Sequence, residues 1–392
     1  MLKFISTIFF FLIAITLVFG QNNYSFFIEK PQFNNSDSNS LYLDISNTNF
    51  LKNNEYFNDF IKGYTLIGYN INPQIVYYTQ SKVNLKGGIF LNKYSGIDNY
   101  SKILPTFSIT YFDKGLEIIM GTIKGTINHN LIEPLFHSEL FFTDNIENGM
   151  QIIFNKNYFN ADIWVNWKKF IFNNDTEQEN FTFGISTKTN LSSDKNKLSI
   201  SVLLQSLTNH WGGQIDTSGK NIKTILNSAA GFDICYNING KIFNSINSEN
   251  YFITFNDMSP TVESYYKNGN GFFSKININT KNTNLSFGFL NTNSYISPLG
   301  NPMYLSVSAF DSTNNKKHRQ LLTGRVTYYS NINSSIKLGL EYETFYDLAN
   351  YNFDYYLGIV MYFKQEFFLN KLTISINKKK IFKENKSVKH PD

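Results

Sequence analysis

Alternation of apolar and polar residues is the feature that most restricts the fold of this chain. In residues 198–205, one face carries Leu198, Ile200, Val202 and Leu204, and the residues between them are mostly polar. The same period of two recurs in residues 159–168, 333–346 and 354–364, whereas helical periodicity is nearly absent. A period of two indicates β-strands with one apolar face. The chain is therefore expected to be all-β.

The lengths of the predicted strands and connections favour a closed barrel. Many strands have about ten residues or more, the length that a strand needs to cross a bilayer. Connections alternate between short turns, such as 112–115 and 331–335, and long loops, such as 128–147 and 207–228. Short periplasmic turns and long extracellular loops are typical of outer-membrane barrels. We predict an antiparallel up-and-down transmembrane β-barrel.

The strand count is expected to be about 16, within a range of 14–18, since such barrels favour even numbers. We count from Ile61–Tyr69 to Asp354–Lys364, with both ends of the barrel in the periplasm. Two further segments alternate and leave the count open. These are Leu41–Ser46 and Leu372–Ile376.

The chain begins with a predicted signal peptide at residues 1–20, in which Lys3 precedes an apolar run. Cleavage after Gly20 would export the rest of the chain. Residues 21–60 are rich in Asn and are interpreted as a leader or a first strand. The barrel is placed at residues 61–378, and residues 379–392 form a Lys-rich tail.

Composition agrees with a surface that faces lipid. Charged residues make up 17% of the chain, against about 25% in ordinary soluble domains, and aromatic residues make up another 17%. With its alternation, loop rhythm and signal peptide, the chain resembles the porin-like outer-membrane β-barrel proteins of Gram-negative bacteria. The resemblance implies outer-membrane lipid and the barrel-assembly machinery as partners. A soluble periplasmic β-sandwich is the rival architecture.

The inward face is expected to hydrate a lumen of mixed charge. Rings of charge in such pores set ion preference, although the same side chains could simply pair across strands. Trp164 could stack on a sugar, form a constriction or fill space. The lumen-lining candidates are Asp162, Trp164, Lys168, Asp233, Arg325, Lys337, Glu341 and Glu343.

The loop at residues 209–216 is the most distinctive predicted connection. It is expected to fold inward as a constriction, and the alternative is that it grips a glycan or a partner. Its binding candidates are His210, Trp211, Gln214 and Asp216.

A metal site is not expected. His129, Glu133 and His137 recur every four residues, but Pro134 disfavours a regular helix there. Only one Cys is present, and no cofactor motif is found.

The predicted function is a porin-like channel for passive passage of small polar solutes. The alternative is a non-channel scaffold or surface-binding barrel whose long loops bind a partner or glycan. A barrel hydrolase that uses His129, His137 or His210 ranks below both, so we expect no enzyme. Net charge is +5, and with the predicted compartment this gives no reason to expect a nucleic-acid partner.

Overall fold

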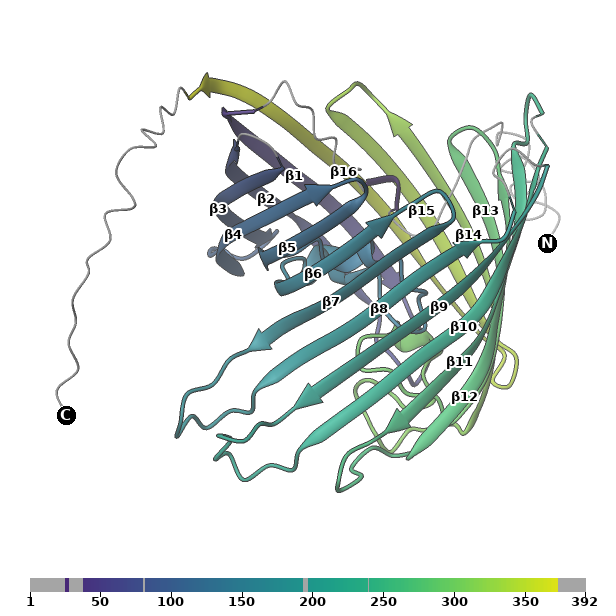
Figure 1. The fold of residues 1–392 in the computed structure, drawn as a ribbon. Coiled ribbons are helices and arrows are strands. Elements are labelled where there is room, and N and C mark those ends of the chain that lie inside the picture. Colours follow the sequence, from purple (N-terminus) through teal and green to yellow (C-terminus); the bar gives the residue numbers. More distant parts are fainter. Residues whose placement is uncertain (1–24, 28–37, 80–81, 193–196, 239, 373–392) are drawn as a thin grey trace, which may run out of the picture.

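The computed structural model describes residues 25–27 and 38–372, apart from residues 80–81, 193–196 and 239. The predicted signal peptide and the Lys-rich tail lie outside the described residues. Sixteen antiparallel strands form one closed barrel in which each strand pairs with its sequence neighbours and β1 pairs with β16 (Figure 1). The strands are β1 (Ser40–Glu55), β2 (Tyr64–Tyr78), β3 (Val83–Tyr94), β4 (Lys102–Asp113), β5 (Leu116–Thr122), β6 (Asn148–Asn155), β7 (Phe159–Lys169), β8 (Asn180–Asn190), β9 (Leu198–Trp211), β10 (Lys223–Asn237), β11 (Ser245–Asp257), β12 (Asn268–Asn279), β13 (Thr283–Asn293), β14 (His318–Asn331), β15 (Ile336–Asp347) and β16 (Asn352–Lys371).

The predicted all-β barrel of sixteen strands is confirmed, but its first strand lies earlier than expected. The barrel begins at Ser40 rather than at residue 61, because β1 falls inside the Asn-rich segment. The inward face of β1 carries polar side chains such as Asp44 and Lys52, but its outward face also includes Asn47 and Asn49, so the alternation has little apolar contrast. β16 ends at Lys371, and most of the alternating segment after it lies outside the described residues.

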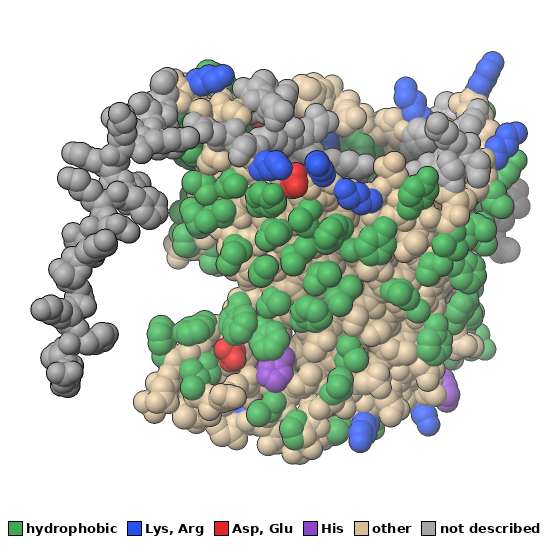
Figure 2. All heavy atoms as spheres, viewed as in Figure 1, with side chains coloured by type: hydrophobic (Ala, Val, Ile, Leu, Met, Phe, Trp, Pro, Cys, Tyr) green, Lys and Arg blue, Asp and Glu red, His purple; other side chains and the backbone are tan. Residues whose placement is uncertain are grey.

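Apolar side chains of the strands lie on the outer face of the wall and polar ones on the inner face, as the alternation predicts. In β9, Leu198 and Leu204 are 48% and 54% exposed on the outer face, whereas Ser201 and Gln205 are buried on the inner face. Apolar side chains cover much of the outer wall in Figure 2. No helix of the described residues is long and apolar enough to span a bilayer.

The lumen is occupied by two loops from the long-loop end. The first is the plug loop, residues 123–147 between β5 and β6, which contains η3 (Thr126–His129) and α2 (Leu140–Thr143). The second is the inner loop, residues 294–317 between β13 and β14, which contains η4 (Pro302–Tyr304). The main chains of the two loops join where His137 N–H donates to Leu299 O at 2.7 Å.

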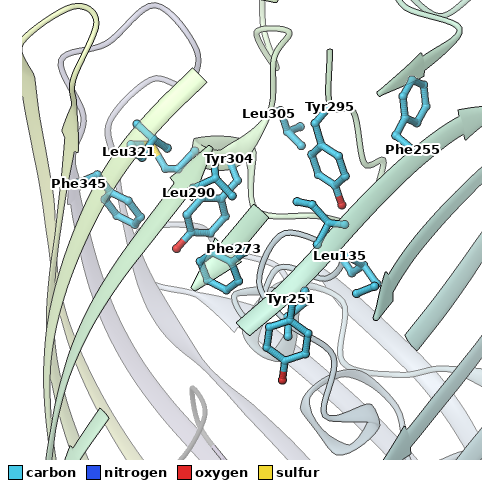
Figure 3. Packing of buried hydrophobic residues seen from close by; sticks show 14 of the residues in the cluster. Leu135, Tyr251, Phe255, Phe273, Leu290, Tyr295, Tyr304, Leu305, Leu321 and Phe345 are labelled. Carbon is cyan, nitrogen blue, oxygen red and sulfur yellow. The ribbon is translucent and has the colours of Figure 1, made fainter. Parts of the chain in front are cut away.

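An apolar core lies inside the barrel, where the sequence predicts a wall facing water. Leu135 of the plug loop and Tyr295 and Tyr304 of the inner loop pack against inward side chains of the wall (Figure 3). These include Phe273 and Phe345. The expectation that the inward face hydrates a lumen is therefore corrected for this part of the wall, where the loops cover apolar side chains.

The barrel wall is shorter at the long-loop end where the plug loop enters, because β5 and β6 stop before their neighbours. β4 pairs with β5 only from Ser108 to Asp113, so its residues 102–107 extend beyond β5. On the other side, Trp167–Lys169 of β7 extend beyond β6. The result is a notch at the long-loop end, and Figure 2 shows the wall hollowed on this side. Pro105 suits the free edge of β4 because it has no N–H to leave unpaired.

Candidate functional site

His129 joins the plug loop to the wall through Asp162 and also pairs with Glu147 at the end of its own loop. Its Nδ1 lies 2.7 Å from Asp162 Oδ2 on β7, and its Nε2 lies 3.3 Å from Glu147 Oε2. The imidazole is 1% exposed and stacks on Trp164 with ring centroids 3.6 Å apart. Gly184 of β8 leaves the room for this stack, since a Cβ there would lie 2.1 Å from the indole.

This setting keeps His129 protonated. Burial alone would lower its pKa, but the charges of Glu147 and Asp162 outweigh burial and raise the pKa to about 9. Both ring nitrogens therefore donate hydrogen bonds at neutral pH. A histidine held in this way tethers the loop and is a poor general base, because a base must be free to accept a proton.

His137 has the opposite protonation state. Burial lowers its pKa, and Lys52 adds to that effect, while Glu139 and Glu133 act against it. The ring is therefore neutral at physiological pH, the state that a general base requires. His137 lies one residue before Ser138, whose hydroxyl is hydrogen-bonded to the Glu133 carboxylate.

A cavity of about 30 Å³ lies beside Ser138. Glu133 and Lys275 line it together with apolar residues of the plug loop. This volume is enough for one water molecule. The cavity therefore brings together a hydroxyl, a carboxylate and an ammonium group. His137 precedes Ser138 in the sequence but does not line this cavity.

Glu139, the residue after Ser138, anchors the plug loop to the barrel wall. Its Oε2 accepts a hydrogen bond from Lys52 Nζ at 2.9 Å, and the Tyr64 hydroxyl donates to Oε1. Burial acts against the charge of Glu139, but Lys52 and His137 lower the pKa to about 2. Lys52 also lies over the ring of Tyr356 on β16, 3.9 Å from its centroid.

Three of the predicted lumen-lining residues form an ion-pair cluster on the inner wall. Arg325 Nη2 lies 2.6 Å from Glu343 Oε1, and its Nε lies 3.4 Å from Glu341 Oε1. All three side chains are buried. Two others, Asp162 and Trp164, hold His129 as described above.

The remaining lumen candidates lie apart from one another. Asp233 of β10 pairs with Lys188 at 3.0 Å. Lys337 at the start of β15 donates to Phe26 O at 3.0 Å. Lys168 near the outer end of β7 is exposed and lines a small cavity of about 10 Å³ with Glu147 and Trp164.

The loop-binding candidates do not form a constriction, so that expectation is wrong. His210 and Trp211 belong to β9, which continues further than the sequence suggests. His210 hydrogen-bonds to Thr224 and to Gly212 O, and Trp211 packs against the interior apolar core. The constriction is made by the plug and inner loops instead.

The remaining residues of 209–216 follow β9 and lie against the loop between β7 and β8. Asp216 Oδ2 accepts a hydrogen bond from Gln178 at 3.1 Å, and Gln214 is exposed. The contact of this stretch is therefore with the loop between β7 and β8.

No metal site forms among the residues that the structure describes. The two carboxylates at His129 approach opposite ring nitrogens, so they cannot share one ion with it. Sequence reasoning considered His137 and Glu133 but missed Lys52 and Glu139. The available signal was the density of charged and hydroxyl residues in 133–139, within an otherwise apolar stretch.

A closed sixteen-stranded barrel with an apolar outer wall defines this chain as a porin-like outer-membrane β-barrel protein. Solved barrels share the fold. A loop L8 deletion mutant of OmpT, an outer membrane protein of Vibrio cholerae, has a TM-score of 0.50 at 12% identity, covering 83% of this chain and 99% of that one. OprD from Pseudomonas aeruginosa has a TM-score of 0.47 at 7% identity, covering 85% and 96%.

The family of the chain follows from a match between its sequence and a family model. The model of the lipid A 3'-O-deacylase-type family matches residues 33–372, which include all sixteen strands and both interior loops. The chain therefore belongs to this family. No curated protein sequence matches the chain. Because the family is one of enzymes, the expectation that the chain is not an enzyme is corrected. The sequence offered no known catalytic motif from which to make that assignment.

Proposed function

We propose that this protein is an outer-membrane esterase that removes an ester-linked acyl chain from a glycolipid of the lipid A type. The observation that carries the proposal is a neutral, half-buried His137 that directly precedes the buried Ser138 in a member of a deacylase-type family. Ester hydrolysis requires a base that activates a hydroxyl or a water molecule. His129 is already protonated, so His137 is the better candidate for that base.

The notch supplies a route for such a substrate. It opens the wall at the long-loop end, where a lipid of the outer leaflet can approach from the side. Phe136 and Leu140 of the plug loop line the small cavity that Lys168 also lines. The apolar side chains suit an acyl chain, while Lys168 is the one basic group of a lining that also includes Asp144 and Glu147.

The test is release of fatty acid from a lipid A-type glycolipid in mixed micelles, measured by mass spectrometry. We expect His137→Ala and Ser138→Ala to reduce the rate by about 100-fold or more. His318→Ala is the matched control, because this histidine is exposed at the start of β14. Heat-dependent gel mobility verifies that each variant folds. The proposal is overturned if the native protein releases no acyl chain.

A second candidate is the porin-like channel for small polar solutes. It is supported by the width of the barrel, since sixteen strands can enclose an aqueous channel, and by half-exposed polar side chains of the inner wall such as Asp233 and Asn247. Movement of the plug loop would be needed for passage. Planar-bilayer recording tests this: deletion of residues 123–147 should give stepwise conductance, and a silent deletion variant would eliminate the channel.

A further inference from the structure

A short segment from the N-terminal end of the chain lies inside the barrel beneath the plug loop. It is η1 (Ser25–Phe27), and Phe27 is 3% exposed. Phe26 stacks on Tyr329 of β14, with ring centroids 4.8 Å apart and planes 18° apart. Phe27 meets the same tyrosine edge-on and lies 5.7 Å from the ring of Tyr362 on β16.

The inner wall is shaped to receive these two rings. Gly339 of β15 faces Phe27, and a Cβ at this position would lie 3.0 Å from Phe27 Cζ. Lys337, two residues earlier on the same strand, donates to Phe26 O at 3.0 Å and lies 5.3 Å from the centroid of the Phe26 ring. One strand thus provides both the space for one ring and a cation for the other.

The same segment touches the plug loop. Phe27 stacks on Phe141 of α2, with centroids 6.4 Å apart and planes 12° apart. The next residue, Phe142, stacks on Phe50 of β1 at 4.9 Å. All four phenylalanines belong to one buried cluster. α2 is therefore held between the wall at β1 and the N-terminal segment.

We infer that the lumen contains a binding site for a pair of adjacent aromatic residues, and that Phe26 and Phe27 occupy it as a latch that keeps the plug loop in place. The site consists of Tyr329, Lys337, Gly339 and Tyr362 on the wall, and Phe141 on the plug loop. Removal of the predicted signal peptide after Gly20 leaves the latch on the exported chain. This inference does not depend on the proposed hydrolysis.

The experiment measures hydrogen exchange of the α2 amides by mass spectrometry in the full-length barrel. Residues 141–144 donate hydrogen bonds within the plug loop, so their exchange reports its local opening. The variants are a Phe26→Ala, Phe27→Ala double substitution and Gly339→Val, which fills the space that Phe27 occupies. Loss of a buried phenylalanine and its ring contacts predicts exchange at least about tenfold faster in both.

The matched controls are Phe172→Ala and Gly87→Val. Phe172 is 72% exposed in an outer loop, and the nearest atom to a Cβ on Gly87 lies 3.9 Å away. If Gly339→Val does not fold, the double substitution still tests the latch, since it leaves every strand unchanged. Unchanged α2 exchange in the folded double variant overturns the inference.

A peptide of residues 21–32 tests whether the site recognises the aromatic pair itself. Added to the double variant, it should restore protection of the α2 amides, whereas the same peptide with both phenylalanines replaced by alanine should not. Equal effects of the two peptides would overturn the assignment of a binding site.

Discussion

The charge on His129 makes a strong prediction about how stability depends on pH. The pKa of His129 is raised from 6.5 to about 9 in the folded protein. Its contribution to stability is therefore fully present below pH 6.5 and is lost as the pH rises through 9. The carboxylate of Glu147 behaves oppositely: its pKa is lowered, so its contribution is lost only in acid.

The size of the effect follows from the two pKa values. The difference between 6.5 and about 9 corresponds to about 3 kcal/mol in the free energy of unfolding. Little of this is screened by solvent, since the imidazole is 1% exposed. His129→Phe preserves a flat ring on Trp164 but removes the charge between the two carboxylates. Below pH 6.5 we expect this variant to be less stable than the native protein by about 3 kcal/mol, and the difference to narrow above pH 9.

The assay is urea unfolding of the folded barrel in detergent at pH 6 to 10, followed by heat-dependent gel mobility and tryptophan fluorescence. His318→Phe serves as the control, because this exposed histidine lies outside the plug loop. It should follow the native profile throughout. The reasoning is refuted if the native protein and His129→Phe keep a constant difference between pH 6 and 10.

Two further predictions concern the packing of the plug loop, and both are measured as urea unfolding free energies. Gly184→Ala places a Cβ 2.1 Å from the Trp164 indole, so we expect a loss of about 1–3 kcal/mol. Gly87→Ala should change little, because its Cβ meets only the Phe107 ring, at 3.9 Å. An equal loss in both variants would contradict the packing argument. Lys52→Met leaves the buried Glu139 carboxylate without its ammonium partner, and we expect a loss of about 3–5 kcal/mol. A Lys52→Met, Glu139→Gln double variant should recover part of that loss, and no recovery would show that the pair is not the cause.

The wall of the barrel could be predicted from sequence because one rule governs every strand. Lipid outside requires an apolar side chain at every second position, as Leu198 to Leu204 show. β1 follows this rule weakly, because its outward positions include Asn47, Asn49 and Asn53.

The interior could not be predicted, because it depends on contacts between loops distant in sequence. Leu135 and Tyr295 have no periodic pattern and become buried only because the two loops meet inside the wall. A partial signal was present: residues 131–136 are unusually apolar for a loop facing water. The contact between His129 and Asp162 could not be predicted for the same reason, because the two residues lie 33 positions apart in the sequence.

The contacts of the plug loop impose an order on assembly of the barrel in the membrane. Glu139 bonds to Lys52, 87 residues earlier, and Glu133 bonds to Asn301, 168 residues later. Contacts over such separations form late, because long stretches of chain must be ordered first. β1 and β16 complete the ring by pairing along the whole of β1. The plug loop is therefore expected to settle inside the wall at a late stage of assembly, close in time to the pairing of β1 with β16.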